Sequence, residues 1–81
     1  MAKVILSAEL QRYTGGTREF EVAANTYQDL VTELRQRFPA LTAAMIEKHA
    51  IAIDGMLIQT PLLETFNSDS ELVFVARIAG G

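Results

Sequence analysis

The chain has 81 residues, a formal net charge of −3 at pH 7, 49% hydrophobic residues and 21% charged residues. This length allows one small domain with its own core, and the absence of cysteine excludes disulfides, thiolate metal sites and a cysteine nucleophile. The acidic balance argues against nucleic acid as the main partner, because binding to phosphates requires clustered positive charge.

The first 23 residues predict a β-hairpin. Every even position from 4 to 10 is apolar, and this alternation is typical of a half-buried strand over residues 4–11. The pair Gly15-Gly16 allows the positive φ angles of a turn. A second strand is predicted where Phe20 and Val22 alternate with two glutamates.

Residues 26–38 predict the main helix. Thr26 is a favourable N-cap, and Asp29 places a carboxylate near the positive end of the helix dipole. Apolar residues recur at helical spacing and form one stripe: Tyr27, Leu30, Val31, Leu34 and Phe38. Pro39 disfavours helical geometry at the residue before it, so the helix should end there. Residues 40–48 then form a short second helix or a turn.

A second hairpin is the clearest local signal in the chain. The dipeptide Asp54-Gly55 lies between two short apolar runs and predicts a two-residue type I′ turn. In this register Ile53 faces Met56. The next pair is Ile51 with Ile58, and we expect all four side chains to point inward.

The last predicted strand is Glu71–Arg77, which follows loops at Thr60-Pro61 and 67–70. Its even positions should face the core, whereas Val73 and Val75 should face outward. The expected order is therefore β-β-α-β-β-β in an α+β domain, with a mixed sheet packed on one main helix. We expect the strands from the two ends of the chain to pair in the middle of that sheet.

Hydropathy predicts a protein of the cytoplasm without a membrane partner. The longest unbroken apolar run is Leu72–Ala76, five residues, far below the ~20 that a membrane-spanning helix needs. Polar residues, Ser7 and Glu9, follow the apolar N-terminal residues too closely for a signal peptide.

Signals for intrinsic catalysis are weak. The chain has no glycine-rich phosphate-binding motif. His49 is the only histidine, and we interpret it as a polar residue in a connecting segment. No sequence feature ties Ser7, Ser68 or Ser70 to this histidine as nucleophile and base. We therefore expect a protein that is not an enzyme and that binds no cofactor or metal itself.

The sequence ends in two glycines, Gly80 and Gly81. A flexible tail without Cβ atoms can enter a narrow channel in another enzyme's active site, and its carboxylate is an unhindered acyl group. Adenylation by an ATP-using partner would make the carbonyl of Gly81 electrophilic, and a sulfur nucleophile could then displace AMP to leave a thiocarboxylate. The alternative is a frayed end without a chemical role.

Motifs spread over essentially the whole length carry a resemblance to a known family: Lys3–Leu6, Thr14–Gly16, Leu30–Leu41, Asp54-Gly55, Thr60–Leu62 and Ala79–Gly81. With these motifs the chain resembles the ubiquitin-like β-grasp sulfur carriers, which include the small subunit of molybdopterin synthase and the thiamin-thiazole sulfur carrier. The segment Phe38–Leu41 and the overall length resemble the molybdopterin branch most. The ending Ile78–Gly81, without a preceding proline, looks more like the thiamin branch.

The resemblance implies a β-grasp domain over residues 1–77 and a flexible C-terminal tail over residues 78–81. It implies that Gly81 is adenylated and converted to a thiocarboxylate, and that Ile78, Ala79 and Gly80 enter the partner's active site. The implied partners are a ubiquitin-activating-type adenylyltransferase that uses ATP, a sulfur donor enzyme, and a larger catalytic subunit such as that of molybdopterin synthase.

The partner-binding surface is predicted at Val73, Val75 and Arg77, because outward apolar residues on the last strand lead directly to the tail. Arg77 is either a pairing group for an acidic partner residue or a solvated strand end. Three other functions stay open: a sulfur carrier for thiamin-thiazole or cysteine synthesis, a ubiquitin-like modifier joined to lysines through Gly81, and a plain interaction domain.

Overall fold

The computed structural model describes residues 1–77, so the predicted tail residues Ile78, Ala79, Gly80 and Gly81 lie outside the described residues. Within residues 1–77, five strands and three helices follow one another in the order β1 (Ala2–Ile5), α1 (Ala8–Gln11), β2 (Glu19–Val22), α2 (Tyr27–Arg37), α3 (Ala43–Glu47), β3 (His49–Ile53), β4 (Met56–Ile58) and β5 (Glu71–Ala76).

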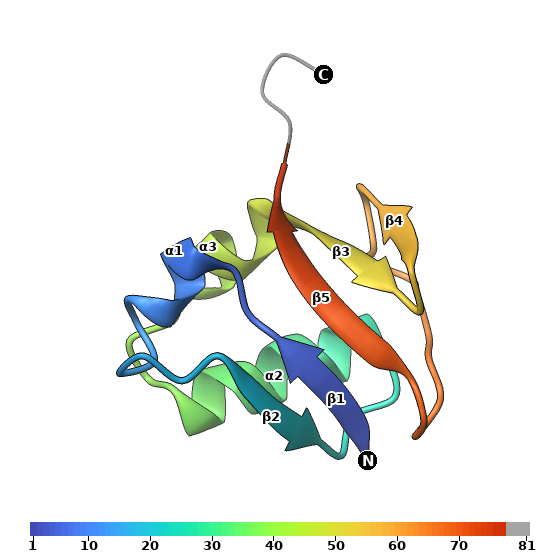
Figure 1. The fold of residues 1–81 in the computed structure, drawn as a ribbon, viewed down its shortest axis with the longest axis horizontal. Coiled ribbons are helices and arrows are strands. Elements are labelled where there is room, and N and C mark those ends of the chain that lie inside the picture. Colours follow the sequence, from blue (N-terminus) through green and yellow to red (C-terminus); the bar gives the residue numbers. More distant parts are fainter. Residues whose placement is uncertain (78–81) are drawn as a thin grey trace.

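The strands form one mixed sheet in the order β2-β1-β5-β3-β4. The first and last strands, β1 and β5, are parallel neighbours in its middle, and the other pairs are antiparallel. Figure 1 shows α2 lying across one face of the sheet, whereas α1 and α3 lie near the end where β5 finishes. The predicted class, the mixed sheet on one main helix and the central pairing of the two terminal strands are confirmed.

The predicted first strand, residues 4–11, is wrong beyond Ile5. Ser7 caps a short helix instead, because its Oγ accepts a hydrogen bond of 3.2 Å from the Leu10 backbone N–H. Leu6 and Leu10 are both buried. A spacing of four residues places two side chains on the same side of a helical turn as well as on the same face of a strand, so the alternation did not distinguish the two structures.

The predicted main helix and the elements that flank it are confirmed. The Thr26 Oγ1 accepts a hydrogen bond of 3.1 Å from the Asp29 N–H, and the helix ends with Phe38 as its C-cap, directly before Pro39. The short helix α3 begins after a second threonine cap, Thr42. In the first hairpin, Gly15 and Gly16 adopt the predicted positive φ angles of 67° and 86°.

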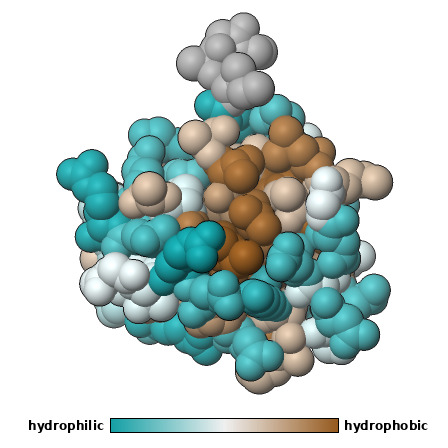
Figure 2. All heavy atoms as spheres, in the orientation of Figure 1, coloured by the Kyte–Doolittle hydropathy of each residue, from teal (hydrophilic) through white to brown (hydrophobic). Residues whose placement is uncertain are grey.

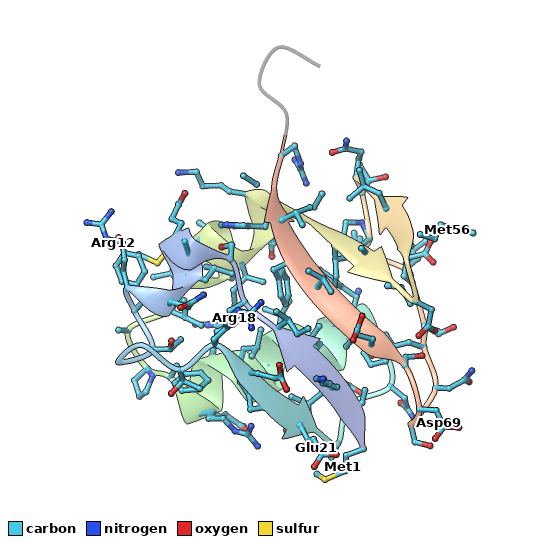
Figure 3. The ribbon with its side chains drawn as sticks, viewed as in Figure 1. Met1, Arg12, Arg18, Glu21, Met56 and Asp69 are labelled. Atoms are coloured by element: carbon cyan, nitrogen blue, oxygen red, sulfur yellow. The ribbon has the colours of Figure 1, made fainter. Side chains whose placement is uncertain are left out.

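The Asp54-Gly55 hairpin forms in the predicted register, with positive φ angles of 52° and 85° at the two turn residues. The prediction that all four paired side chains point inward is correct for Ile51, which is fully buried, and wrong for Met56, which is 70% exposed. Met56 lies on the outer edge strand, beyond the strands that α2 covers, and Figure 3 shows its side chain pointing away from the sheet.

The core lies between the sheet and α2, and β5 crosses its centre. Leu72 and Phe74 of β5 are 0% and 2% exposed. Val73 and Val75, on the opposite face of the same strand, are half-buried. The predicted inward and outward faces of the last strand are therefore confirmed, and this strand belongs to both the core and the uncovered surface of the sheet.

Replacing Phe74 with alanine should lower the free energy of unfolding by about 3–5 kcal/mol, because it leaves a cavity between the central strand and α2. The matched variant Val75→Ala removes a half-buried side chain from the same strand and should cost about 1 kcal/mol. Urea unfolding of both variants measures the difference. Equal losses would contradict the assignment of the two faces.

Candidate functional site

The side of the sheet away from α2 carries a continuous apolar surface. Strand register aligns Ile5 with Val73, Val73 with Ala52, and Ala52 with Leu57, so that one row of side chains crosses four strands. A second pair, Ala50 with Val75, lies beside this row. We call these six residues the open face: Ile5, Ala50, Ala52, Leu57, Val73 and Val75. Figure 2 shows this apolar area over β5, β3 and β4, surrounded by hydrophilic side chains.

The open face is only partly sheltered. Four of its members are half-buried, Leu57 is 49% exposed, and Ala50 is only 1% exposed. Carboxylates from Glu19, Glu21 and Glu71 occupy the same side of the sheet at its margin, as the strand register requires. Glu19 forms an ion pair of 3.2 Å with Lys3, exposed to solvent and therefore weak. An apolar centre with an acidic margin suits a protein surface with an apolar centre and basic margin.

The structure brings the predicted docking residues Val73 and Val75 together in the middle of this surface. It places Arg77 differently, at the end of β5 and folded back toward the domain. The Arg77 Nη2 donates hydrogen bonds to two backbone carbonyls, that of Glu47 at 3.1 Å and that of Gln59 at 2.7 Å. These carbonyls belong to the last residue of α3 and to the segment that leaves β4.

A groove of about 280 Å³ lies beside Arg77 and is lined by Tyr27, Glu47, Thr60, Pro61, Leu62 and Arg77. Tyr27 is 2% exposed, and its hydroxyl has no hydrogen-bond partner within residues 1–77. Burial raises the pKa of this phenol, the neighbouring Glu47 carboxylate raises it further, and the Arg77 guanidinium partly opposes both effects. The phenol therefore stays neutral at ordinary pH.

Sequence reasoning missed the role of His49. The interpretation as a polar residue in a connecting segment is wrong, because His49 begins β3 and is 2% exposed. Its Nδ1 donates to the Met45 carbonyl at 3.0 Å. In the neutral ring Nε2 then accepts from the Ser7 hydroxyl at 2.9 Å, so this serine does have a histidine beside it. The two residues are 42 positions apart, which leaves no local signal for their contact.

The Ser7–His49 pair is built as a structural link. Its orienting group is a backbone carbonyl rather than a carboxylate, and the Ser7 Oγ also caps α1. Each polar atom of the pair therefore has a hydrogen-bond partner, and these hydrogen bonds together join α1, α3 and β3. Among residues 1–77, no three side chains of the His, Asp or Glu types come together as a metal site would require.

Within residues 1–77, no helix is long and apolar enough to cross a bilayer.

Two solved structures share the architecture. The solution structure of the small archaeal modifier protein 1 from Methanosarcina acetivorans matches with a TM-score of 0.77 and 24% identity, over 99% of this chain and 95% of that one. The crystal structure of the protein of that name from Haloferax volcanii matches with a TM-score of 0.71 and 21% identity, over 99% and 98%. No protein-family model and no curated protein sequence matches the chain. The fold is therefore a ubiquitin-like β-grasp, as the sequence predicted.

A double-mutant cycle with Ser7→Ala and His49→Ala should give a coupling of about 0.5–3 kcal/mol in the free energy of unfolding, because each residue satisfies a largely buried polar atom of the other. Urea unfolding of the wild type, both single variants and the double variant supplies the four values. Strictly additive losses would show that the hydrogen bond contributes nothing.

Proposed function

We propose that this protein is a non-catalytic sulfur carrier whose C-terminal glycine, Gly81, is activated with ATP and converted to a thiocarboxylate. One observation carries the proposal: the pair Gly80-Gly81 follows the central strand of a ubiquitin-like β-grasp domain. Glycine has no Cβ atom, so such an ending passes through a channel too narrow for other residues. A β-grasp domain can fold without two glycines at its C-terminus, so the fold does not explain why Gly80 and Gly81 are there.

The chemistry proceeds in two steps on a partner enzyme, adenylation of Gly81 and then displacement of AMP by sulfur. A carboxylate oxygen of Gly81 attacks the α-phosphorus of ATP, and pyrophosphate leaves to give an acyl adenylate. The sulfur of a hydrosulfide ion attacks the carbonyl carbon, the bond to the phosphate oxygen breaks, and AMP leaves with the bonding electrons. Loss of the sulfur-bound proton leaves the thiocarboxylate. The domain itself contributes recognition, and the partner supplies the nucleotide site.

The open face is the surface that we assign to partner recognition. It is apolar at its centre, acidic at its margin and not covered by a helix. Val73 and Val75 lie on it, and their strand, β5, leads directly toward the tail. A partner that binds the open face therefore receives the tail from a fixed origin. The partner classes are a ubiquitin-activating-type adenylyltransferase, a sulfur donor enzyme and an acceptor enzyme.

We propose that the tail enters the larger catalytic subunit of molybdopterin synthase, which holds the pterin precursor that accepts the sulfur, with this chain as the small subunit. The support for this choice is the resemblance of the segment Phe38–Leu41, where α2 ends before Pro39. As an alternative, a carrier for thiamin-thiazole or cysteine synthesis would pass the sulfur of the same thiocarboxylate to a different acceptor.

A second function, attachment to other proteins through Gly81, is favoured by a specific observation. The two solved structures compared above belong to proteins named as small archaeal modifiers. The activation step would be identical, and a lysine amine would replace the sulfur nucleophile. Lys3 and Lys48 are the only lysines of the chain, so linkage of one copy to another would be confined to them and to the N-terminus.

Intact mass spectrometry tests the carrier proposal directly. The purified chain, incubated with ATP, a ubiquitin-activating-type enzyme and a sulfur donor, should gain the mass of one sulfur-for-oxygen exchange, mapped to Gly81. Deletion of Gly81 should abolish the gain without changing the unfolding midpoint, because this residue follows the folded domain. A gain that survives the deletion would refute the proposal, as would no gain with an enzyme active on a known carrier. Isopeptide-linked adducts in a lysate would instead favour the modifier function.

A charge placed on the open face should weaken recognition by the activating partner. Val75→Asp should raise the KM for the carrier in ATP–pyrophosphate exchange about tenfold or more, which corresponds to ~1.4 kcal/mol of lost binding. Gln36→Asp adds the same charge at an exposed position of α2, on the other side of the sheet, and should leave KM unchanged. Equal effects of both variants would show that net charge, rather than the open face, governs recognition.

A further inference from the structure

The last strand loses one of its two neighbours before it ends. Pairing of β5 with β1 stops at Val73, opposite Ile5, whereas pairing with β3 continues to Ala76, opposite His49. From Val75 onward, backbone hydrogen bonds therefore hold β5 on one side only. A strand end held on one side can swing away from the sheet, so the direction in which the chain continues depends on other contacts at this point.

Arg77 supplies those contacts. Its Nη2 reaches across the end of the sheet to the carbonyl of Glu47 at 3.1 Å and the carbonyl of Gln59 at 2.7 Å. The first of these is one of the carbonyls that the end of α3 leaves without an intrahelical partner, a position where arginine is favourable. The guanidinium thus joins the end of β5 to α3 and to the segment after β4.

The chemistry of the side chain suits this bridge. A planar guanidinium carries several N–H groups in a fixed arrangement and can donate to two separate acceptors at once, whereas a lysine ammonium is a compact, mobile and strongly hydrated charge. Arg77 is exposed to solvent, and it lines the groove together with Tyr27 and Pro61.

We infer that Arg77 is a positioning residue that fixes the direction in which the tail leaves the domain, so that the carboxylate of Gly81 is presented correctly to the activating enzyme. This inference rests on the proposed function of Gly81. It assigns Arg77 an intramolecular role, in place of an ion pair with an acidic residue of the partner.

The kinetic test uses ATP–pyrophosphate exchange by a ubiquitin-activating-type enzyme with the full chain as substrate. Arg77→Ala should lower kcat about tenfold and leave KM within about twofold, because the open face still binds the enzyme while the tail is misdirected. Arg77→Lys should fall nearly as far, since an ammonium does not reproduce the two-carbonyl bridge. Arg12→Ala removes the same charge at the exposed C-cap of α1, where Figure 3 shows Arg12 pointing away from the domain, and should change neither constant.

Each contrary result identifies a different role. A raised KM that Arg77→Lys restores would show that Arg77 pairs with the partner and would overturn the inference. Wild-type rates in Arg77→Ala would overturn it as well. Thermal unfolding of each variant, measured first, ensures that rates are compared between folded proteins.

A second measurement does not depend on activation. The NMR order parameter of the backbone amide at position 77 should be that of ordered backbone in the wild type and in Arg12→Ala, and should fall clearly in Arg77→Ala and Arg77→Lys. An unchanged order parameter would overturn the positioning role whatever the enzyme assay shows. If the wild-type chain is not activated at all while the order parameter falls as expected, the function of Gly81 fails and the bridge made by Arg77 stands.

Discussion

A single long helix can cover only one face of a five-stranded sheet, and this limit determines where the protein can interact. Helix α2 has 11 residues, which gives about 16 Å of length at 1.5 Å per residue. It shelters the side of the sheet that carries Leu72 and Phe74. The other side has no such cover, yet β5, in the middle of the sheet, carries the apolar residues Val73 and Val75 on it. An apolar surface open to partners is the direct consequence.

Local signals predicted most of this architecture. The threonine cap and Pro39 mark the two ends of α2, and Asp54-Gly55 fixes the residue pairing of the second hairpin. Each of these signals acts through the geometry of its immediate neighbours. The exception among local signals is the segment after Ile5, where two apolar residues four positions apart fit a helix and a strand equally well. There the Ser7 cap decided the outcome.

The candidate site was predictable only where a single strand defines it. Alternation along β5 is enough to place Val73 and Val75 outward, but the row that continues through Ala52 and Leu57 depends on register between strands. The Ser7–His49 contact joins distant segments. Arg77 binds backbone carbonyls, which every residue possesses, so no side-chain pattern could reveal its acceptors.

The parallel pairing of β1 with β5 has a consequence for how the protein is made. Lys3 pairs with Glu71, so the centre of the sheet has very high contact order and cannot assemble on the ribosome until nearly the whole chain has emerged. The open face includes Val73 and Val75 from that last strand. A chain whose translation has not passed β5 therefore lacks the centre of the open face.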